Sequence, residues 1–422
     1  LYLTLTGRND WASQLANSST SSFFYPSVGL SGVISEMIQM PSFIDYMKVR
    51  GSFSSVGMPY PRNLTSPTYE YNEATQSWKP KTHYPIGDLK PERTDSWEVG
   101  LDMKLFKDFN LGLSWYLANT FNQTFDPQIS VSSGYTTIYL QTGYVRNTGL
   151  ELSLGYGHTW NNNFRWDSNF TLSHNKNKIK ELVRDYVHPE TGELINKDRL
   201  DVGGLGKARF ILKEGGTLGD LYTQSDLKRD DNGMVDIDPT GIVAIENNLP
   251  DIKLGSVFPK ANLAWSNHFS WKGISLSALF TARIGGIVYS ATEAAMDQYG
   301  VSERSALARD NGGVLVNNRT LVDAQNYYTT IGSESGLPQY YTYNATNVRL
   351  QEASIGYLIP RKWLGNVCDI QVSVIGRNLW MIYNKAPFDP ESVATTDNYY
   401  QGIDYFMLPS TRNIGFNVKI NF

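Results

Sequence analysis

The sequence has little that would build a cross-linked protein, a helical membrane protein or a nucleic-acid-binding protein. Cys368 is the one cysteine in 422 residues, which excludes an internal disulfide framework and a cysteine-based zinc site. No apolar run approaches the ~20 residues that a membrane-spanning helix needs. Lysine and arginine total 37 against 41 acidic residues, without a basic block, so the clustered charge of a nucleic-acid-binding protein is missing.

Aromatic residues and glycine are plentiful instead. The chain has 26 tyrosines, 18 phenylalanines, 10 tryptophans and 36 glycines, while charged residues make up only 18%. This composition is typical of strands, turns and aromatic anchors rather than of helices. At 422 residues, the chain is long enough for several soluble domains or for one large barrel.

Apolar side chains alternate with small or polar ones along many segments. Trp97, Val99 and Leu101 occupy odd positions, and Glu98 and Asp102 occupy even ones. Because successive side chains of a strand point to opposite faces, this pattern predicts strands with one apolar and one polar face. We expect about a dozen such strands. They include 28–37, 46–56, 97–105, 111–117, 150–157, 164–173, 261–271, 274–284, 348–358, 370–379 and 413–422.

The predicted connections fall into two length classes. Short ones such as 107–110, 161–163 and 271–273 alternate with long polar ones, namely 57–93, 175–205, 218–260, 290–344 and 381–410. Outer-membrane barrels pair short periplasmic turns with long extracellular loops, whereas soluble sandwiches seldom carry so many loops beyond ~15 residues. One short helix is suggested inside the loops, at 291–299.

Aromatic placement favours a membrane barrel over a soluble sandwich. Tryptophan and tyrosine gather near the expected strand ends, where such rings mark the interfaces between water and lipid. They are Tyr25, Tyr46, Trp97, Tyr116, Trp160, Trp166, Trp265, Trp271, Tyr357 and Trp380. The polar faces also carry charges in mid-strand, which a water-filled lumen tolerates. We therefore predict an all-β fold, a transmembrane antiparallel β-barrel with long extracellular loops.

Several specific motifs occur in order along the whole chain. Leu89-Lys-Pro-Glu-Arg-Thr94 precedes Trp97-Glu-Val-Gly-Leu101, and Asn147-Thr-Gly-Leu-Glu151 follows. Later come Gly376-Arg-Asn-Leu379, Asp389-Pro-Glu391 and Leu408-Pro-Ser-Thr-Arg412. The other motifs are Thr6-Gly-Arg-Asn-Asp-Trp11, Tyr25-Pro-Ser27, Lys48-Val-Arg-Gly-Ser52, Gly255 with Pro259, and Arg349-Leu-Gln-Glu352. Together these motifs resemble the C-terminal barrel half of SusC/RagA-type TonB-dependent outer-membrane transporters.

This resemblance implies a domain organisation and a function. Residues 1–422 would form the C-terminal part of a large plugged barrel, and a plug, a TonB-contacting segment and the first strands would precede them. The family imports oligosaccharides or peptides across the outer membrane with energy from TonB, together with a SusD-like surface lipoprotein. TonB would act through the missing N-terminal region. Outer-membrane lipid would surround the barrel, and no cofactor or enzymatic activity is implied.

The last strand carries its own implication from the resemblance. Terminal strands that end on an aromatic residue resemble the assembly signal that the outer-membrane folding machinery recognises. Phe416 and Phe422 would carry that signal here.

Two other functions remain open at this point. One is an outer-membrane surface receptor or adhesin without transport. The other is a soluble β-rich protein that binds or hydrolyses glycans.

Loop aromatics are the best candidates for substrate contact. A rigid ring stacks on a sugar or packs on a peptide side chain at low entropic cost. The candidates are Tyr327, Tyr328, Tyr340, Tyr341, Tyr399 and Tyr400, with Tyr343 and Tyr405 as further members of the set. The alternative is that these rings pack loop on loop or against the lipoprotein.

Acidic residues and histidines predict no metal or catalytic site. Asp230, Asn232, Gly233 and Asp236 resemble a calcium-binding loop, but Lys228 occupies its first ligand position and Pro239 its last, which favours a solvated acidic turn. The five histidines have no metal-binding spacing. Asp389 and Glu391 are a possible glycosidase carboxylate pair, yet the family motif makes them a loop element.

Overall fold

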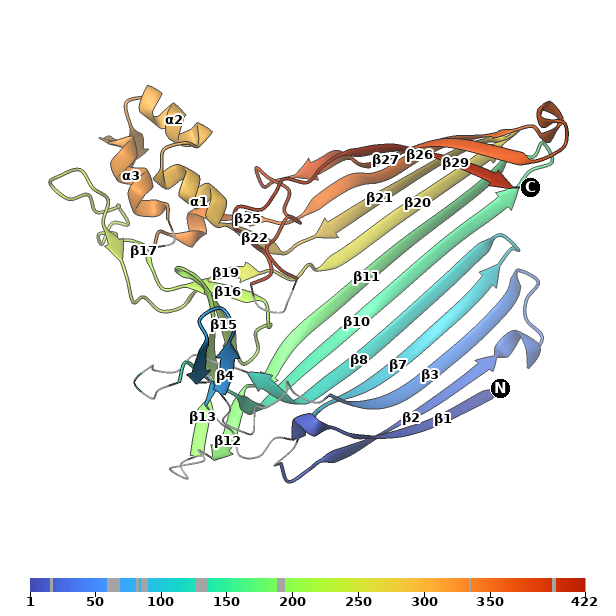
Figure 1. Cartoon of the computed structure of the whole chain (residues 1–422), viewed down its shortest axis with the longest axis horizontal. Helices are drawn as coiled ribbons and strands as arrows, with labels where there is room; N and C mark the ends of the chain where they lie inside the picture. Colours follow the sequence, from blue (N-terminus) through green and yellow to red (C-terminus); the bar gives the residue numbers. More distant parts are fainter. Residues whose placement is uncertain are drawn as a thin grey trace.

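The computed structural model describes residues 1–15, 18–58, 69–80, 83–84, 90–125, 132, 135–187, 194–333, 335–396 and 400–421. Its main feature is a 12-stranded antiparallel sheet, called the wall, in which each strand pairs with the next wall strand along the chain (Figure 1). The wall strands are β1 (Tyr2–Trp11), β2 (Ser22–Val33), β3 (Ile44–Met58), β7 (Glu92–Leu105), β8 (Phe109–Phe125), β10 (Leu140–Thr159), β11 (Arg165–Glu181), β20 (Ala261–Trp271), β21 (Ile274–Ile284), β26 (Asn347–Ile359), β27 (Asp369–Asn384) and β29 (Asn413–Asn421).

The strand prediction is confirmed for most of the wall. β20 and β21 have the predicted bounds, and the other predicted segments overlap wall strands, several of which are longer than expected. β10, for example, has 20 residues. The prediction missed β1, because only Leu3 and Leu5 supply aliphatic side chains before the pattern passes into Gly7 and Asn9.

The register confirms one polar and one apolar face. On β10, Glu151 pairs with Ser114 and Ser173, while the next residue, Leu152, pairs with Leu113 and Leu172. The apolar face carries large exposed side chains, such as Val99 at 53%. A soluble protein would bury such a continuous apolar surface, whereas a lipid-facing wall exposes it.

Three aromatic residues expected at the lipid interface lie on the polar face instead. Tyr116 pairs with Gly149 and Glu98, Tyr25 pairs with Arg8, and Tyr46 pairs with Lys104. The prediction is therefore wrong for Tyr25, Tyr46 and Tyr116, because the period of two places them with the polar side chains.

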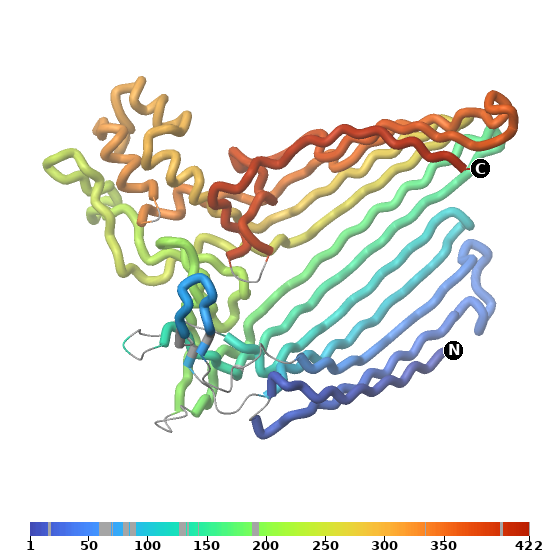
Figure 2. Tube along the Cα trace, viewed as in Figure 1, coloured from blue at the N-terminus to red at the C-terminus, as the bar shows by residue number. Residues whose placement is uncertain are grey.

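The long connections at one end of the wall form a folded loop layer (Figure 1). Its largest part lies between β11 and β20, and Figure 2 shows this green to yellow segment leaving the wall and returning to it. It contains β12 (Val183–Val187), β13 (Leu194–Lys197), β14 (Arg199–Leu205), β15 (Ala208–Lys213), β16 (Asp220–Thr223), β17 (Asp226–Leu227), β18 (Ile245–Glu246) and β19 (Ile252–Ser256). The sequence predicts long polar connections at residues 175–205 and 218–260. The structure differs, because β11 extends to Glu181 and the rest of these segments contains short strands.

The segment between β21 and β26 adds the helices of the loop layer. It contains β22 (Ile287–Ser290), α1 (Ala291–Gln298), α2 (Glu303–Asp310), β23 (Val314–Val316), β24 (Thr320–Val322), α3 (Ala324–Ile331) and β25 (Thr342–Asn344). α1 confirms the suggested helix. The remaining short strands are β4 (Tyr69–Asn72), β5 (Ser77–Pro80), β6 (His83–Tyr84), β9 (Thr137–Ile138) and β28 (Ile403–Asp404). Within the described ranges, no helix is long and apolar enough to cross a membrane.

The loop layer has a hydrophobic core of its own. Phe125 and Ile179 at the loop ends of β8 and β11 are fully buried in one cluster with Phe210, Leu221 and Tyr341 of the layer. Burial of such side chains contributes about 1.5–3 kcal/mol each. The layer is therefore packed onto the end of the wall as a folded unit.

Candidate ligand-binding wall and loop layer

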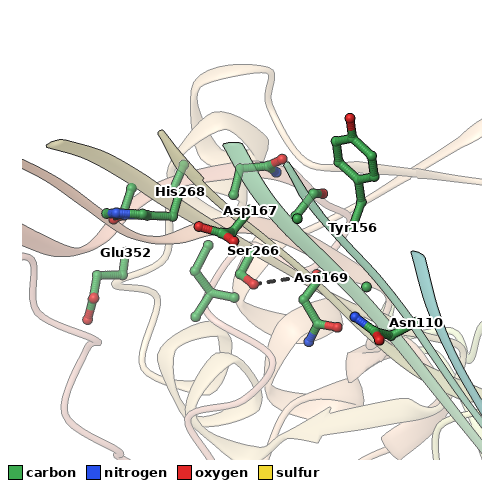
Figure 3. Close-up of a pocket in the computed structure, with 14 residues that line it drawn as sticks. Asn110, Tyr156, Asp167, Asn169, Ser266, His268 and Glu352 are labelled. Atoms are coloured by element: carbon green, nitrogen blue, oxygen red, sulfur yellow. Dashed lines mark hydrogen bonds between the residues drawn. The ribbon is translucent and has the colours of Figure 1, made fainter. Parts of the chain in front are cut away.

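A hollow of about 500 Å³ lies along the polar face towards the short-turn end of the wall (Figure 3). Asp167 of β11 pairs with His268 of β20, which in turn pairs with Ser277 of β21. The His268 ring nitrogen Nδ1 lies 2.8 Å from the Ser277 hydroxyl. Asn169 and Glu352 also line the hollow. This lining of carboxylates, amides and hydroxyls suits a hydrated polar ligand rather than an apolar one.

A second hollow of about 420 Å³ lies on the same face, lined in part by Asp102, Ser114 and Glu151. Arg50 of β3 reaches across two strands at its edge. Its Nη2 lies 3.0 Å from Glu98 Oε1, its Nη1 lies 3.0 Å from Asp102 Oδ2, and it also donates to the Ser114 hydroxyl. These side chains are partly exposed, so the ion pairs add little stability and mainly fix the positions of the charges.

Two glycines on this part of the polar face leave room for the side chains of the neighbouring strand. A Cβ at Gly100 would come within 2.6 Å of the Arg50 guanidinium carbon, and a Cβ at Gly149 within 2.2 Å of the Tyr116 ring. Both long side chains can therefore lie flat across the neighbouring strand.

A buried ionic contact ties the loop layer to the wall. Arg349 of β26 is 4% exposed, and its Nη1 and Nη2 lie 3.0 and 2.8 Å from the two carboxylate oxygens of Asp389. Glu391 Oε2 lies 3.4 Å from the same guanidinium, and Asn347 donates to Glu391. The Asp-Pro-Glu segment lies in the loop between β27 and β29, as predicted, and the structure shows in addition that it anchors this loop to the wall.

A second polar cluster lies inside the helical part of the layer. Asp297 of α1 accepts hydrogen bonds from Ser302 and from the Tyr341 hydroxyl, the latter at 2.8 Å, and its Oδ2 lies 2.7 Å from Arg304 Nη2. Burial, and then the Asp297 charge, raise the pKa of Tyr341 well above its usual range. Tyr341 is therefore a neutral hydrogen-bond donor that joins α1 to the segment before β25.

The loop tyrosines differ in how much of each ring a ligand could reach. Tyr341 is fully buried, and Tyr327, Tyr328 and Tyr340 are half-buried against the core of the layer. Burial also raises the pKa of Tyr327 to about 12. Tyr400 is exposed at 41% and packs against Phe210. Tyr399 lies outside the described residues. Substrate contact by the set stays a prediction, which Tyr400 and the similarly exposed Tyr405 fit better than the buried and half-buried members.

The acidic segment near Asp230 is organised by its own backbone. Asp230 Oδ1 accepts hydrogen bonds from the backbone N–H groups of Asn232 and Met234, both at 2.9 Å. Asp236 pairs with Lys228 at 2.8 Å. Among the described residues, no three histidine, cysteine or acidic side chains are arranged to hold a metal ion. The geometry is that of an Asx turn in an exposed hairpin.

The terminal strand β29 is the edge neighbour of β27. Phe416 pairs with Val374 and is 83% exposed on the apolar face, while Phe422 lies outside the described residues. Their role as an assembly signal stays a prediction.

Sequence reasoning did not identify Arg50 or Arg349 as organising residues. Alternation alone places Arg50 on the polar face with Lys48 and Ser52, so this position could be read from the sequence. The partners of Arg349 lie 40 residues further along the chain, and no local pattern indicates them.

Comparison with known proteins agrees with this geometry. The family model described as "TonB dependent receptor-like, beta-barrel" matches residues 1–232. The chain is 24% identical to TonB-dependent receptor P3 of Formosa agariphila, over 99% of this chain and 44% of the relative. It is also 24% identical to TonB-dependent receptor P26 of the same organism, again over 44% of that protein.

Solved structures share the fold. The RagAB peptide transporter structure superposes with a TM-score of 0.76 at 19% identity, over 100% of this chain and 46% of that chain. The "closed-closed" state of the RagAB peptide importer gives a TM-score of 0.74 at 18% identity. The chain thus spans less than half the length of the relatives it matches. With its alternating wall and its matched family model, this chain belongs to the TonB dependent receptor-like, beta-barrel family, and its wall is an outer-membrane β-barrel wall that shares its fold with the RagAB transporter.

Proposed function

We propose that this chain forms the C-terminal part of the barrel of a nutrient importer that takes up oligosaccharides or peptides across the outer membrane with energy from TonB. The observation that carries the proposal is the polar face of the wall, which has hollows of about 500 and 420 Å³ along its strands and a folded loop layer at one end. A lined hydrophilic path suits the passage of polar solutes. We assign no covalent chemistry to this chain.

The partners follow from the same proposal. A SusD-like surface lipoprotein would dock on the loop layer, and TonB would act through a plug and a contact segment encoded outside residues 1–422. Support comes from the match to less than half of each relative and from the fold shared with RagAB, which is described as a peptide transporter.

The test uses the full-length gene in its own organism. Uptake of fluorescent peptides and of fluorescent oligosaccharides is measured in the wild type, in a deletion strain, in the complemented strain and in a strain without TonB. We expect uptake of at least one ligand class to be lost in the deletion and TonB-less strains and to return on complementation. Unchanged uptake in the deletion strain would refute the proposal.

The same experiment separates the proposal from a receptor or adhesin without transport. Such a protein would bind the ligand at the cell surface, and internal fluorescence would not depend on TonB. The soluble glycan-binding alternative does not agree with the family or with the exposed apolar face of the wall.

A further inference from the structure

Two cations stand at the loop end of the β20–β21 pair. Arg283 lies on the polar face of β21, where it pairs with Asn262 of β20 and Asn347 of β26. Lys260 immediately precedes β20, and its backbone N–H donates to the Ile284 carbonyl at 2.7 Å. A Cβ at Gly285 would lie 2.9 Å from Lys260 Cγ, so the lysine stem passes beside the chain two residues after Arg283.

Arg283 is held in place without being neutralised. Its Nη2 donates to the Val257 carbonyl at 2.8 Å, while its Nε is buried and has no hydrogen-bond partner among the described residues. Within the same described ranges, neither Arg283 nor Lys260 has a carboxylate oxygen within 4.0 Å. Burial removes water from the guanidinium, and this costs free energy. An anionic acceptor that binds the free N–H groups would offset that cost.

Other arginines on the polar face differ from Arg283 in this respect. Arg8 lies 2.7 Å from Asp10, Arg50 lies 3.0 Å from Glu98, and Arg377 lies 2.8 Å from Glu352. The wall thus places a carboxylate beside each of these guanidinium groups. Among the residues that the structure describes, Arg283 differs from these polar-face arginines in having no carboxylate beside it.

The nearest source of negative charge is already engaged. Glu391 acts electrostatically on Arg283, but its carboxylate is bound by Arg349 at 3.4 Å and by Asn347 at 3.2 Å. Asp389 is likewise held by both terminal nitrogens of Arg349. The described loop therefore leaves the positive charge of Arg283 without a counter-ion of its own.

From these contacts we infer that Arg283 and Lys260 form a binding site for an oxyanion carried by the transported ligand, either the carboxylate of a peptide or the sulfate of an oligosaccharide. The guanidinium offers directed donors to two oxygens, and the ammonium adds a second charge from the neighbouring strand. Amide groups of Asn262 and Asn347 flank the site on the polar face. This inference rests on the proposed import function and specifies its ligand chemistry.

The test measures binding to the purified full-length protein by calorimetry, with two matched probe pairs. One pair is a peptide with a free C-terminal carboxylate and the same peptide with a C-terminal amide. The other is a neutral oligosaccharide and its monosulfated form. We expect the native protein to prefer the anionic member of one pair by about tenfold, as charged hydrogen bonds of this kind contribute, and the pair that shows the preference identifies the source of the oxyanion.

Three variants assign the preference to the site. The double substitution Arg283→Gln with Lys260→Gln should remove the preference and leave affinity for the neutral member unchanged. Arg283→Lys should keep part of it, since the charge remains. Arg8→Gln is the matched control, because Arg8 is a polar-face arginine near the loop end of β1 whose charge Asp10 already neutralises, and it should keep the full preference.

Each outcome has a separate meaning. Binding of both members of a pair with equal affinity by the native protein, or a preference that survives the double substitution, overturns the oxyanion site and leaves the import proposal standing. Failure of the native protein to bind any of the four probes counts against the import proposal itself and removes the basis of the site with it.

Discussion

Arg349 on the polar face of β26 donates hydrogen bonds to both carboxylate oxygens of Asp389. Both side chains are nearly excluded from solvent, at 5% and 9% exposure. This contact joins a wall strand to the long connection between β27 and β29. A bidentate ion pair of this kind fixes the orientation of the two side chains as well as the distance between them. It is the best-defined point at which the loop layer is held to the wall.

Removing one partner of this pair should loosen the loop. Asp389→Asn removes the carboxylate that both terminal nitrogens of Arg349 contact and leaves the buried guanidinium with only the 3.4 Å ion pair to Glu391, which costs up to about 3–5 kcal/mol. We expect faster proteolytic cleavage between residues 385 and 412 in the full-length protein. Glu352→Gln is the control, because it breaks an exposed pair with Arg377 that is worth at most about 1 kcal/mol. Equal cleavage rates in the two variants would contradict the anchoring role.

The flat position of Tyr116 depends on Gly149. Gly149→Ala places a methyl group where the ring lies, with contacts of 2.2–2.4 Å, so the ring must move. We expect a loss of about 1–3 kcal/mol in stability, measured by thermal unfolding. The double variant with Tyr116→Ala should recover part of this loss because the obstructing ring is gone. Additive losses in the double variant would show that the ring does not cause the effect.

The apolar face should reject charge where the polar face accepts it. Val99 and Ser52 lie on adjoining strands of the wall at similar positions along the barrel axis, but they point to opposite faces. Val99→Arg should lower barrel stability by about 2–4 kcal/mol near the bilayer midplane. Ser52→Arg should have little effect. The yield of heat-modifiable folded protein on a gel measures both, and equal yields would count against a lipid-facing role for Val99.

Acid should weaken the loop layer through Asp251. Hydrogen bonds from Arg199, opposed by burial and supplemented by Lys213, hold the pKa of Asp251 well below its usual range. The unfolded pKa is about 4, so this carboxylate stabilises the layer above that pH, and the stabilisation is lost as the pH falls through the lower folded value. The difference in melting temperature between native protein and Asp251→Asn should therefore shrink as the pH falls from about 7 to about 2. A constant difference would contradict this assignment.

Alternation of apolar and polar residues predicted the wall because the two faces of each wall strand lie in different environments, lipid on one side and a polar lumen on the other. Residues 261–271 and 274–284 therefore show their strands at the correct bounds. β1 was missed because its outer half carries Gly7 and Asn9 where other strands carry aliphatic residues. Within β1, the neighbouring strand supplies the hydrogen bonds that the local pattern does not indicate.

The loop layer was not predictable in the same way. Its core joins Phe125, Phe210 and Tyr341, which lie far apart in the sequence, and no period relates them. Tyr341 was a reasonable candidate for ligand stacking by residue type alone. Its burial depends on Asp297 and Arg304, so only the folded layer distinguishes a packed tyrosine from one that a ligand can reach.

The Asx turn at Asp230 also has a practical consequence for engineering. The hydrogen bonds that the Asp230 carboxylate accepts are internal to residues 230–234, and a Cβ added at Gly233 would meet no atom within 4 Å, so the tip of this hairpin bears no part of the core. A short foreign peptide grafted between Asp231 and Asn232 would be displayed beyond the loop layer while the wall keeps its register. The barrel can thus carry a foreign epitope at a position that its core packing does not involve.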